Sequence, residues 1–392
     1  MSEVIISAAK RTPIGGFQGC FSDVEATLLG SVAIKGALDQ LGSHDLSVDE
    51  VLMGNVLPAG LRQAPARQAT LGAGLGREVP ATAISKVCGS GMKAVCQGFD
   101  AIFANSAKII VTGGMESMTR APYLSKDSRS GARLGHCQLD DHMFLDGLED
   151  AYDKGALMGA FAENCATEYQ LSREAQDEYA LRSLSRANLA QKRGAFELEI
   201  TPVTVVNRKG DVVVREDEQP KSARPDRIPM LRPAFAKDGT VTAANASSIS
   251  DGAAALVLSS RDKALEDELP IRAKIVGWAG HAQDPRWFST APIPATQKLL
   301  NRIGWSVDDV DLWEVNEAFA VVPMVFMQSL GIPVKKMNVN GGACALGHPI
   351  GASGARIIVT LLHAMEARKA QRGVAAICIG GGEGLAIAIE RE

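Results

Sequence analysis

The sequence predicts an α/β protein. Short β-branched segments alternate with longer segments of helical periodicity at both ends of the chain, and this alternation is typical of the strands and helices of α/β folds. The clearest strand-like segments span residues 3–7, 108–112, 272–276 and 375–379. The chain has 392 residues, of which 46% are hydrophobic and 22% charged. It can therefore bury the cores of two or three domains.

A helix is expected directly after Cys88 in the first half of the chain. Apolar residues recur there with the spacing of one helical face, at Met92, Val95, Cys96, Phe99, Ile102 and Phe103. We expect Cys88 in the first turn of this helix. The strand-like segment 108–112 follows it.

The middle of the chain departs from the alternation. Strand and helix patterns fail between about residues 119 and 242, and residues 215–233 contain five Lys or Arg and four Pro. This composition favours an ordered loop segment or a lid, and not sheet structure. We expect a loop domain here.

The second half of the chain repeats the first. The segment 48–51 (VDEV) precedes Asn55, and the similar segment 307–310 (VDDV) precedes Asn316. Cys88 then follows Asn55 by 33 positions, and His348 follows Asn316 by 32. Such internal similarity indicates two copies of one structural unit.

In the second copy, His348 takes the place of Cys88. Pro349 suits a first helical position, because it lacks an N–H and its φ is already helical. The helical face continues at Ile357, Ile358, Leu361, Leu362 and Met365. A thiol and an imidazole are thus each expected at a helix N-terminus, where unpaired N–H groups favour negative charge. This environment should lower the pKa of the Cys88 thiol and make it reactive.

Charge and cysteine usage exclude several classes of protein. The formal net charge of −4 provides no overall positive field for nucleic acid or an acidic membrane. No CxxC pair occurs, so a disulfide scaffold or a zinc site is not expected. Residues 1–10 lack the pattern of a signal peptide, and no apolar stretch approaches the ~18 residues of a membrane span. We expect a cytoplasmic protein with no membrane association and seven reduced cysteines, at Cys20, Cys88, Cys96, Cys137, Cys165, Cys344 and Cys378.

Four motifs are rich in Gly, Cys, His and Asn. They are VCGSG at 87–91, NEAF at 316–319, the glycine-rich segment 341–354 around His348, and CIGGG at 378–382. With these motifs in order, from the AAKRTPIG opening to the GGGEG near the end, the chain resembles thiolases of the acetyl-CoA acetyltransferase type over nearly its whole length.

The resemblance implies the five-layered αβαβα thiolase fold, with two pseudo-symmetric halves and an inserted loop domain. The N-terminal half would span residues 1–118 and be completed by about 243–269. The loop domain would span 119–242 and provide CoA-binding and oligomer contacts. The C-terminal half would span 270–392.

The resemblance also implies roles that suit acyl transfer to a thiol, a reaction that needs a nucleophile, a base and oxyanion donors. Cys88 would be the nucleophile, and His348 its base. Cys378 would remove a proton from the methyl group of acetyl-CoA, while His348 and a water held by Asn316 bind the thioester oxygen. The backbone N–H groups of Cys88 and Gly380 would form the second oxyanion hole. The implied substrates are acetyl-CoA, acetoacetyl-CoA and CoA, with no separate cofactor.

Residues of the loop domain and the second half would bind CoA. Arg215, Lys221, Arg224 and Arg227 are candidate cations for its phosphates. The acyl and pantetheine parts would contact apolar and small residues, which are Leu157, Met158, Phe235, Ala243, Ser247, Phe288, Ala318 and Phe319. The chain departs from the family pattern at three of these places: Leu157 replaces a His, Phe288 aligns with a Met of the acyl pocket, and a loop Arg falls near Pro220.

Alternative functions remain open at this point. A 3-ketoacyl-CoA thiolase of fatty-acid degradation would act on longer or branched chains, and Leu157 and Phe288 bear on that preference. A ketosynthase-like condensing enzyme would have a second catalytic His where this chain has Cys378 and Asn316. A redox-responsive binding module, with a reversible disulfide between Cys88 and Cys378, would need no oxyanion donors.

The remaining cysteines and histidines carry no motif. Cys20, Cys96, Cys137, Cys165 and Cys344 are expected to be small buried hydrophobes. The histidines expected on the surface or in structural roles are His44, His136, His142, His281 and His363. Family likeness further implies a homo-oligomer, a tetramer built as a dimer of dimers, assembled partly through residues 119–150.

Overall fold

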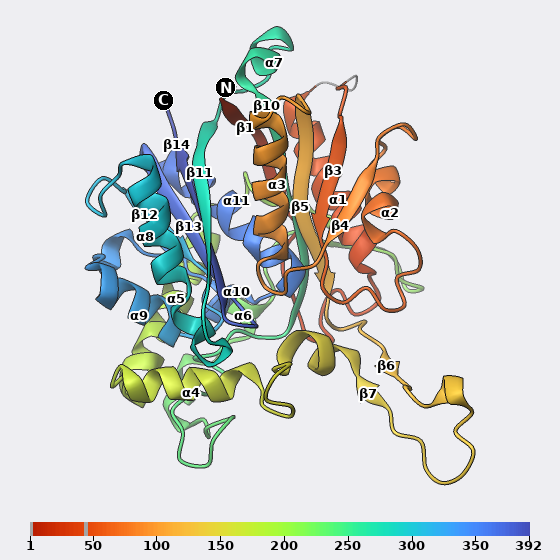
Figure 1. Cartoon of the computed structure of the whole chain (residues 1–392), viewed down its shortest axis with the longest axis vertical. Coiled ribbons are helices and arrows are strands. Elements are labelled where there is room, and N and C mark those ends of the chain that lie inside the picture. Colours follow the sequence, from red (N-terminus) through yellow and green to blue (C-terminus); the bar gives the residue numbers. More distant parts are fainter. Residues whose placement is uncertain (1–2, 43–45) are drawn as a thin grey trace.

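A ten-stranded mixed sheet runs through residues 3–42 and 46–392, the part of the chain that the computed structural model describes (Figure 1). At its middle, β1 (Val4–Arg11) pairs antiparallel with β11 (Ala273–Ala282). Outward from β1 the strands are β10 (Ser250–Ser260), β5 (Ile109–Ser117), β3 (Glu50–Gly54) and β4 (Ala81–Ile84). Outward from β11 they are β14 (Glu383–Glu390), β13 (Arg372–Ile379) and β12 (Leu312–Val315). The short β2 (Gly15–Gly16) extends the sheet at β10.

The two halves of this sheet share one topology. β5 is parallel to β3 and antiparallel to β10, just as β13 is parallel to β12 and antiparallel to β14. In both halves the last strand lies beside the first. Among the described residues, β4 has no counterpart in the second half. The shared strand order confirms the duplication that the sequence predicts.

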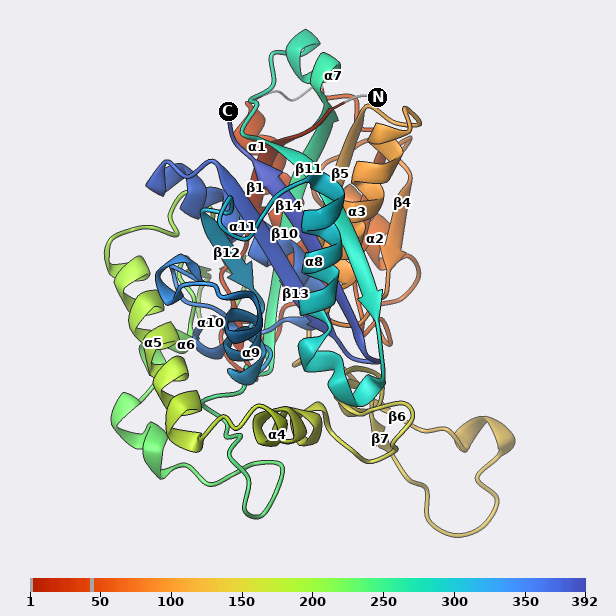
Figure 2. The same cartoon turned by 60° about the vertical axis from the view of Figure 1, so that its left-hand side comes forward.

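Helices cover both faces of each half (Figures 1 and 2). α3 (Ser90–Phe103) and α11 (Ile350–Arg368) pack together between the halves, in one core with strand residues of both. α1 (Ala26–Leu41) and α2 (Pro65–Gly72) cover the outer face of the first half, and α8 (Pro292–Ile303) and α9 (Val321–Leu330) that of the second. The result is the expected αβαβα order of five layers.

Strand residues alternate between these layers. On β3, Val51 and Met53 belong to the outer core with α1, whereas Leu52 belongs to the central core with α3. A strand that is covered on both faces has hydrophobic residues at every position, which is why these segments appear as continuous apolar runs. The four strand-like segments of the sequence lie in β1, β5, β11 and β13, so these predictions are confirmed.

The loop segment, residues 118–249, leaves the sheet after β5 and returns at β10. Figure 2 shows its helices below and beside the core, with the β6–β7 hairpin projecting away from the body. As expected, it adds no strand to the main sheet, although it contains two small two-stranded sheets of its own. Its strands are β6 (Tyr123–Leu124), β7 (Asp140–Asp141), β8 (Val203–Val205) and β9 (Val212–Val214). Its helices are α4 (Met158–Glu168), α5 (Arg173–Lys192), α6 (Gln219–Ser222), the π-helix η2 (Phe144–Leu148) and the 3₁₀ turns η1 (Ser128–Ser130) and η3 (Pro225–Met230).

A buried ion cluster ties the loop segment to the central strand. Nε of Arg11, on β1, lies 2.6 Å from Oε1 of Glu199, and its Nη1 lies 2.7 Å from Oδ1 of Asp217. All three side chains are completely buried. Because two carboxylates face one guanidinium, they hold the pKa of Arg11 above its ordinary value despite burial.

The remaining short helices connect strands or flank the second half. They are α7 (Arg261–Glu266), η4 (Pro285–Thr290), η5 (Val334–Lys336) and α10 (Ala343–Leu346). Within residues 3–42 and 46–392, no helix is long and apolar enough to cross a membrane.

Candidate active site

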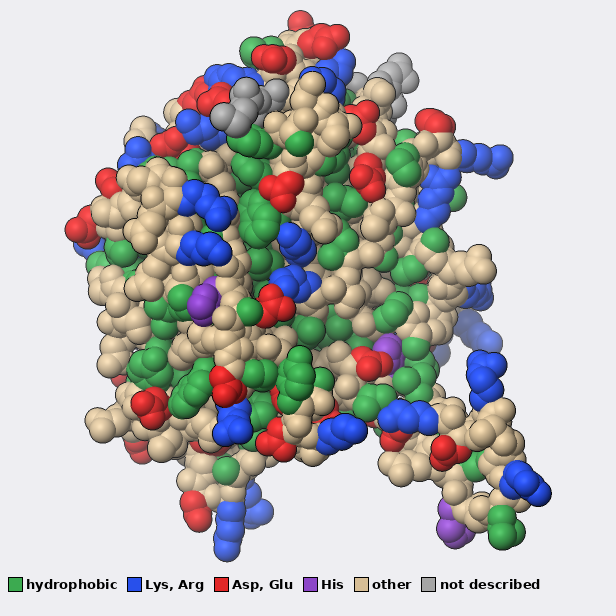
Figure 3. Space-filling view, in the orientation of Figure 1, with side chains coloured by type: hydrophobic (Ala, Val, Ile, Leu, Met, Phe, Trp, Pro, Cys, Tyr) green, Lys and Arg blue, Asp and Glu red, His purple; other side chains and the backbone are tan. Residues whose placement is uncertain are grey.

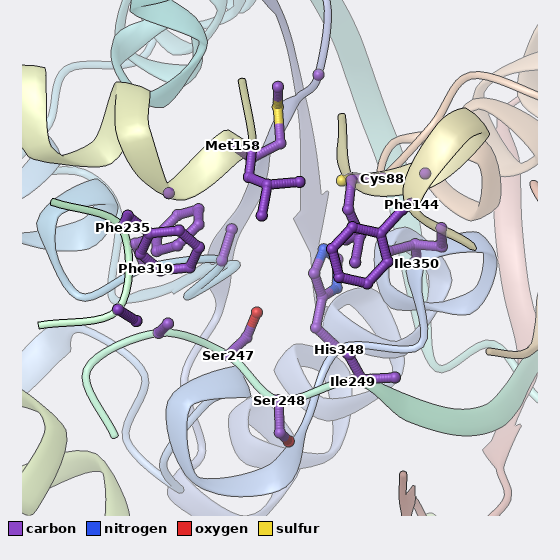
Figure 4. A pocket seen from close by; sticks show the side chains of 18 of the residues that line it. Cys88, Phe144, Met158, Phe235, Ser247, Ser248, Ile249, Phe319, His348 and Ile350 are labelled. Atoms are coloured by element: carbon purple, nitrogen blue, oxygen red, sulfur yellow. The ribbon is translucent and has the colours of Figure 1, made fainter. Parts of the chain in front are cut away.

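A cavity of about 360 Å³ lies where the two halves meet the loop segment. Figure 4 shows Cys88, His348, Phe144 and Ile350 together on one side of it, with Met158, Phe235 and Phe319 on the other. Its lining is almost entirely apolar. Among the residues singled out in the sequence, it is lined by Cys88, His348, Gly380, Leu157, Met158, Phe235, Ala243, Ser247, Phe288, Ala318 and Phe319.

Cys88 sits in a tight turn immediately before α3. The turn is closed by backbone hydrogen bonds from Gly89 to Lys86 and from Ser90 to Val87, each of 3.0 Å. Val87 adopts φ 45°, a conformation that is strained for a β-branched residue. The helix begins at Ser90, so Cys88 precedes the first turn by two residues instead of lying within it.

Burial controls the acidity of the Cys88 thiol. The backbone N–H groups of Gly380 and of Cys88 itself lower the pKa of the thiol, but burial outweighs them and raises the pKa to about 11. The expectation that the helix terminus would lower the pKa of this thiol is therefore wrong for the protein without substrate. A charge that lies in an apolar cavity loses more hydration than two N–H groups restore.

His348 lies just before α11, which begins at Ile350 with Pro349 as its N-cap. The helix thus starts one residue later than the sequence predicts. Nδ1 of His348 is 2.5 Å from Oγ of Ser353. Nε2 is buried and has no hydrogen-bond partner among the described residues. Burial and the nearby positive charge of Arg356 lower the pKa of His348 to about 3, so the imidazole is neutral at pH 7.

The segment of residues 247–250, called the strap below, fixes the backbone of His348. The N–H of His348 lies 3.2 Å from the carbonyl oxygen of Ser248 and 3.2 Å from Oγ of Ser250. Ser248 and Ile249 also line the cavity, beside the predicted Ser247. No motif or periodicity points to Ser248, Ile249, Phe144, Leu148 or Ile350, because only the path of the folded chain brings these residues to the cavity.

Cys378 and Asn316 lie behind the cavity wall and do not line it. Both are completely buried, Cys378 on β13 and Asn316 directly after β12. Burial and the adjacent Cys88 raise the pKa of the Cys378 thiol well above its ordinary value. The amide atoms Oδ1 and Nδ2 of Asn316 have no hydrogen-bond partner in the described chain, a state that buried amides rarely keep unless water or a ligand satisfies them.

The predicted cations lie at an adjoining cavity. Arg224 and Arg227 line a space of about 340 Å³ that shares Ala243 and Ser248 with the first cavity. Lys221 forms an ion pair with Glu216 instead. Arg215 lines neither cavity.

The other cysteines and histidines differ in how exposed they are and in what they contact. Cys96 and Cys165 are buried as expected, Cys20 and Cys344 are partly exposed, and Cys137 is exposed, so the prediction of burial is wrong for Cys137. His363 contacts the carbonyl oxygen of Ala9 at 3.1 Å and His142 pairs with Asp146 at 2.7 Å, both structural contacts. His136 is exposed and His281 partly so, while His44 lies outside the described residues. No group of three or more His, Cys, Asp or Glu side chains in residues 3–42 and 46–392 has the arrangement of a metal site.

Comparisons with known proteins cover the whole chain. The thiolase N-terminal domain family matches residues 4–262, and the thiolase C-terminal domain family matches residues 269–391. Acetyl-CoA acetyltransferases of Cupriavidus necator and Escherichia coli are 49% and 50% identical to the chain, over 100% of each sequence. The crystal structure of the Bacillus anthracis acetyl-CoA acetyltransferase superposes with a TM-score of 0.97 at 39% identity, covering 100% of this chain and 99% of that one. The Ascaris suum Acat5 thiolase, solved in complex with coenzyme A, superposes with a TM-score of 0.94 at 42% identity over 100% of both chains.

Proposed function

Because the chain belongs to the thiolase family, we propose that it is an acetyl-CoA C-acetyltransferase. It would interconvert two acetyl-CoA with acetoacetyl-CoA and CoA. Relatives that bear this activity in their names are 47–50% identical over essentially the full chain. The observation that carries the proposal is the meeting of Cys88, His348 and the N–H of Gly380 in one apolar cavity.

The first half-reaction is acyl transfer to Cys88. Nε2 of His348 takes the thiol proton as the sulfur attacks the thioester carbonyl, and the same nitrogen returns the proton to the departing CoA sulfur. The N–H groups of Cys88 and Gly380, which favour negative charge at the sulfur, then stabilise the developing oxyanion. The raised pKa of Cys88 and the lowered pKa of His348 mean that both groups are neutral before substrate binds. Proton transfer therefore accompanies the attack instead of preceding it.

The second half-reaction forms the carbon–carbon bond. Burial and Cys88 keep Cys378 as a thiol at rest, so its proton first passes to Nε2 of His348. The resulting Cys378 thiolate then removes a proton from the methyl group of a second acetyl-CoA. The protonated Nε2 of His348 and a water held by Asn316 would stabilise the enolate oxygen, a role that suits Nε2 and the Asn316 amide because neither has a hydrogen-bond partner in the described residues. The enolate carbon attacks the acetyl group on Cys88, and the Cys88 sulfur departs and takes the proton from Nε2 of His348. No metal or separate cofactor takes part in this scheme.

The cavity suits the thioester end of CoA. Apolar side chains from the loop segment and the second half, including Met158, Phe235 and Phe319, would hold the pantetheine arm. Arg224 and Arg227, at the adjoining cavity, would face the phosphates. Phe288 is 2% exposed and packs edge-on against Phe319 with ring centroids 6.3 Å apart. This packing limits the room beside the acyl group and favours a short chain over the long substrates of a 3-ketoacyl-CoA thiolase.

Thiolysis of a series of 3-ketoacyl-CoA substrates separates these two activities. We expect the largest kcat/KM for acetoacetyl-CoA and a steady fall as the chain lengthens. A preference for long chains would assign the protein to fatty-acid degradation instead.

The covalent intermediate provides the direct test. After incubation with acetyl-CoA, peptide mapping by mass spectrometry should find the acetyl group on Cys88, and on the same peptide of a Cys137→Ser control. Cys378→Ala should still acquire the adduct but should not form acetoacetyl-CoA. An active enzyme without an adduct on Cys88 would end the assignment. Full turnover of Cys88→Ser, with loss of oxidant response in Cys378→Ser, would point to the redox module.

We further propose a cytoplasmic homotetramer, with residues 119–242 as the loop domain between halves that span 1–118 with 243–269 and 270–392. The hairpin of residues 119–150 projects from the body with apolar and basic side chains along it (Figure 3). Leu134 is 99% exposed, and Tyr123 and Leu139 are also largely exposed. Side chains of this kind are typical of an interface between subunits. Size-exclusion chromatography with light scattering should give four chains per particle, and a monomer would contradict the proposal.

A further inference from the structure

Nδ1 of the His348 ring has one hydrogen-bond partner among the described residues, the hydroxyl of Ser353. Ser353 is completely buried in the first turn of α11, five residues after His348. Its Oγ lies 2.5 Å from Nδ1 of His348 and 2.9 Å from the carbonyl oxygen of Pro349. The hydroxyl therefore has two polar contacts and a single proton.

The chemistry of the two neighbours fixes where that proton lies. The Pro349 carbonyl can only accept, whereas an imidazole nitrogen can donate. Both contacts are hydrogen bonds only if Ser353 donates to Pro349 and accepts from Nδ1–H. In the opposite arrangement, two oxygen lone pairs would face each other at 2.9 Å. Nδ1 therefore carries the proton, and Nε2 has a free lone pair.

That lone pair belongs to a buried nitrogen without a hydrogen-bond partner in the described residues, on a ring that lines the cavity. We propose that Ser353 is a positioning residue, which holds His348 in the Nδ1–H tautomer so that Nε2 can take the proton of Cys88. The inference rests on the proposed function, in which His348 is the base. A hydroxyl acceptor suits this task because, unlike a carboxylate, it orients the ring without stabilising a permanent imidazolium.

Surrounding groups act in the same direction. Arg356, three residues beyond Ser353 on α11, places a buried positive charge near the ring and disfavours its protonation. Arg356 itself pairs with Glu314, whose Oε1 lies 3.0 Å from Nη1. Among the described residues, the His348 ring is hydrogen-bonded to Ser353 and to no carboxylate. The ring thus remains neutral until it receives the proton of Cys88 as the sulfur attacks the substrate.

A structural alternative is that Ser353 only bonds back to the preceding helical turn, as buried serines in helices often do. The chain offers a matched control for that role. Ser31 on α1 is also buried, and its Oγ donates to the carbonyl oxygen of Thr27, four residues earlier, at 2.8 Å. It has no contact with His348 or with the cavity.

The test measures single-turnover acetylation of Cys88 by acetyl-CoA in the full-length protein, using mass spectrometry of the Cys88 peptide. Ser353→Ala should slow acetylation about tenfold, the equivalent of one lost hydrogen bond, with KM changed less than about twofold. Ser31→Ala should leave the acetylation rate unchanged. It should lower Tm by about as much as Ser353→Ala does. An unchanged rate in Ser353→Ala would overturn the proposal.

A double-mutant cycle with His348→Ala decides whether Ser353 acts through the imidazole. In the His348→Ala background, Ser353→Ala should change the acetylation rate less than about twofold, because the base that it positions is already absent. An equal loss in both backgrounds would mean a general structural role and would overturn the proposal. If His348→Ala alone left acetylation at the wild-type rate, His348 would not be the base, and the proposed function would be wrong at that point. This result differs from one in which only Ser353→Ala has no effect.

Discussion

At the scale of single residues, Cys88 is subject to opposing effects. Two backbone N–H groups favour its thiolate, and burial disfavours it more strongly. The same N–H groups are the oxyanion donors of the proposed reaction, so they are needed for a charge that forms on the substrate oxygen and not for one that rests on sulfur. A thiol that stays protonated until substrate arrives is also protected from unwanted oxidation, which requires the thiolate.

The raised pKa of Cys88 predicts how fast it is alkylated at each pH. Because the thiolate is the reactive form and the pKa is about 11, the iodoacetamide rate at Cys88 should rise about tenfold per pH unit from pH 7 to pH 10 with no plateau. Peptide mapping measures this rate, with the exposed Cys137 as an internal reference for reagent quality. A plateau near neutral pH would show that the thiolate is already formed without substrate.

His348 combines the roles of base and oxyanion donor in the proposed reaction. His348→Ala should lower kcat by about a hundredfold to ten-thousandfold, the range of a general acid–base catalyst. Since Nε2 has no hydrogen-bond partner in the described residues, the loss of the ring should change the free energy of unfolding only through the cavity that it leaves and the lost Nδ1–Ser353 hydrogen bond. Steady-state thiolysis of acetoacetyl-CoA measures the effect. A folded variant with a near-normal rate would remove His348 from the mechanism.

At the scale of elements, the site depends on how closely α3 and α11 approach. Gly91 and Gly354 lie at their contact, where a Cβ on Gly354 would meet the backbone N of Met92 at 2.4 Å. These two helices begin just after Cys88 and His348, respectively. Their spacing therefore sets the distance between the thiol and the imidazole.

Gly354→Ala should force these two helices apart. We expect a loss of about 1–3 kcal/mol in the free energy of unfolding, as for other overpacked cores, together with slower acetylation of Cys88. Urea denaturation and the acetylation assay measure the two effects. An unchanged stability would mean that the helices do not constrain each other at this glycine.

Element positions were largely predictable, but element ends were not. The apolar faces of α3 and α11 and the four strand segments follow from periodicity and β-branched content, which act within a few residues. The turn at Val87 and the N-cap at Pro349 depend on contacts from elsewhere: the N–H of Gly380, the strap at Ser248 and the glycines of the opposing helix. These contacts shift each helix start by one or two residues from its local signal.

At the scale of the whole molecule, Arg11 holds the loop segment on the central strand. The cluster of Arg11, Glu199 and Asp217 joins β1 to two points of a segment almost 200 residues away. That segment supplies Leu157, Met158 and Phe235 to the cavity. Stability and substrate binding are thereby coupled through one buried group of charges.

Asp217→Ala should leave part of the Arg11 charge uncompensated in the interior. We expect a loss of about 3–5 kcal/mol in the free energy of unfolding, the cost of breaking a buried ion pair, measured by urea denaturation. Asp39→Ala is the control, because Asp39 forms an exposed ion pair with Lys35 at 3.1 Å and should change stability by less than about 1 kcal/mol. Equal effects of the two substitutions would show that burial of the cluster has no energetic consequence.

The sequence by itself determined the fold class, the duplication, and the residue types of the cavity, because periodicity, spacing and motif are local properties of the chain. Tertiary structure alone decided the acidity of Cys88 and His348, the enclosed positions of Cys378 and Asn316, and the contact of Ser353 with the imidazole. The physical reason is that hydration and hydrogen bonding depend on which atoms surround a group in space. In this protein those atoms come from the turn at Val87, the strap at Ser248 and helix α11, and Cys88 and Ser353 are 265 positions apart in the chain.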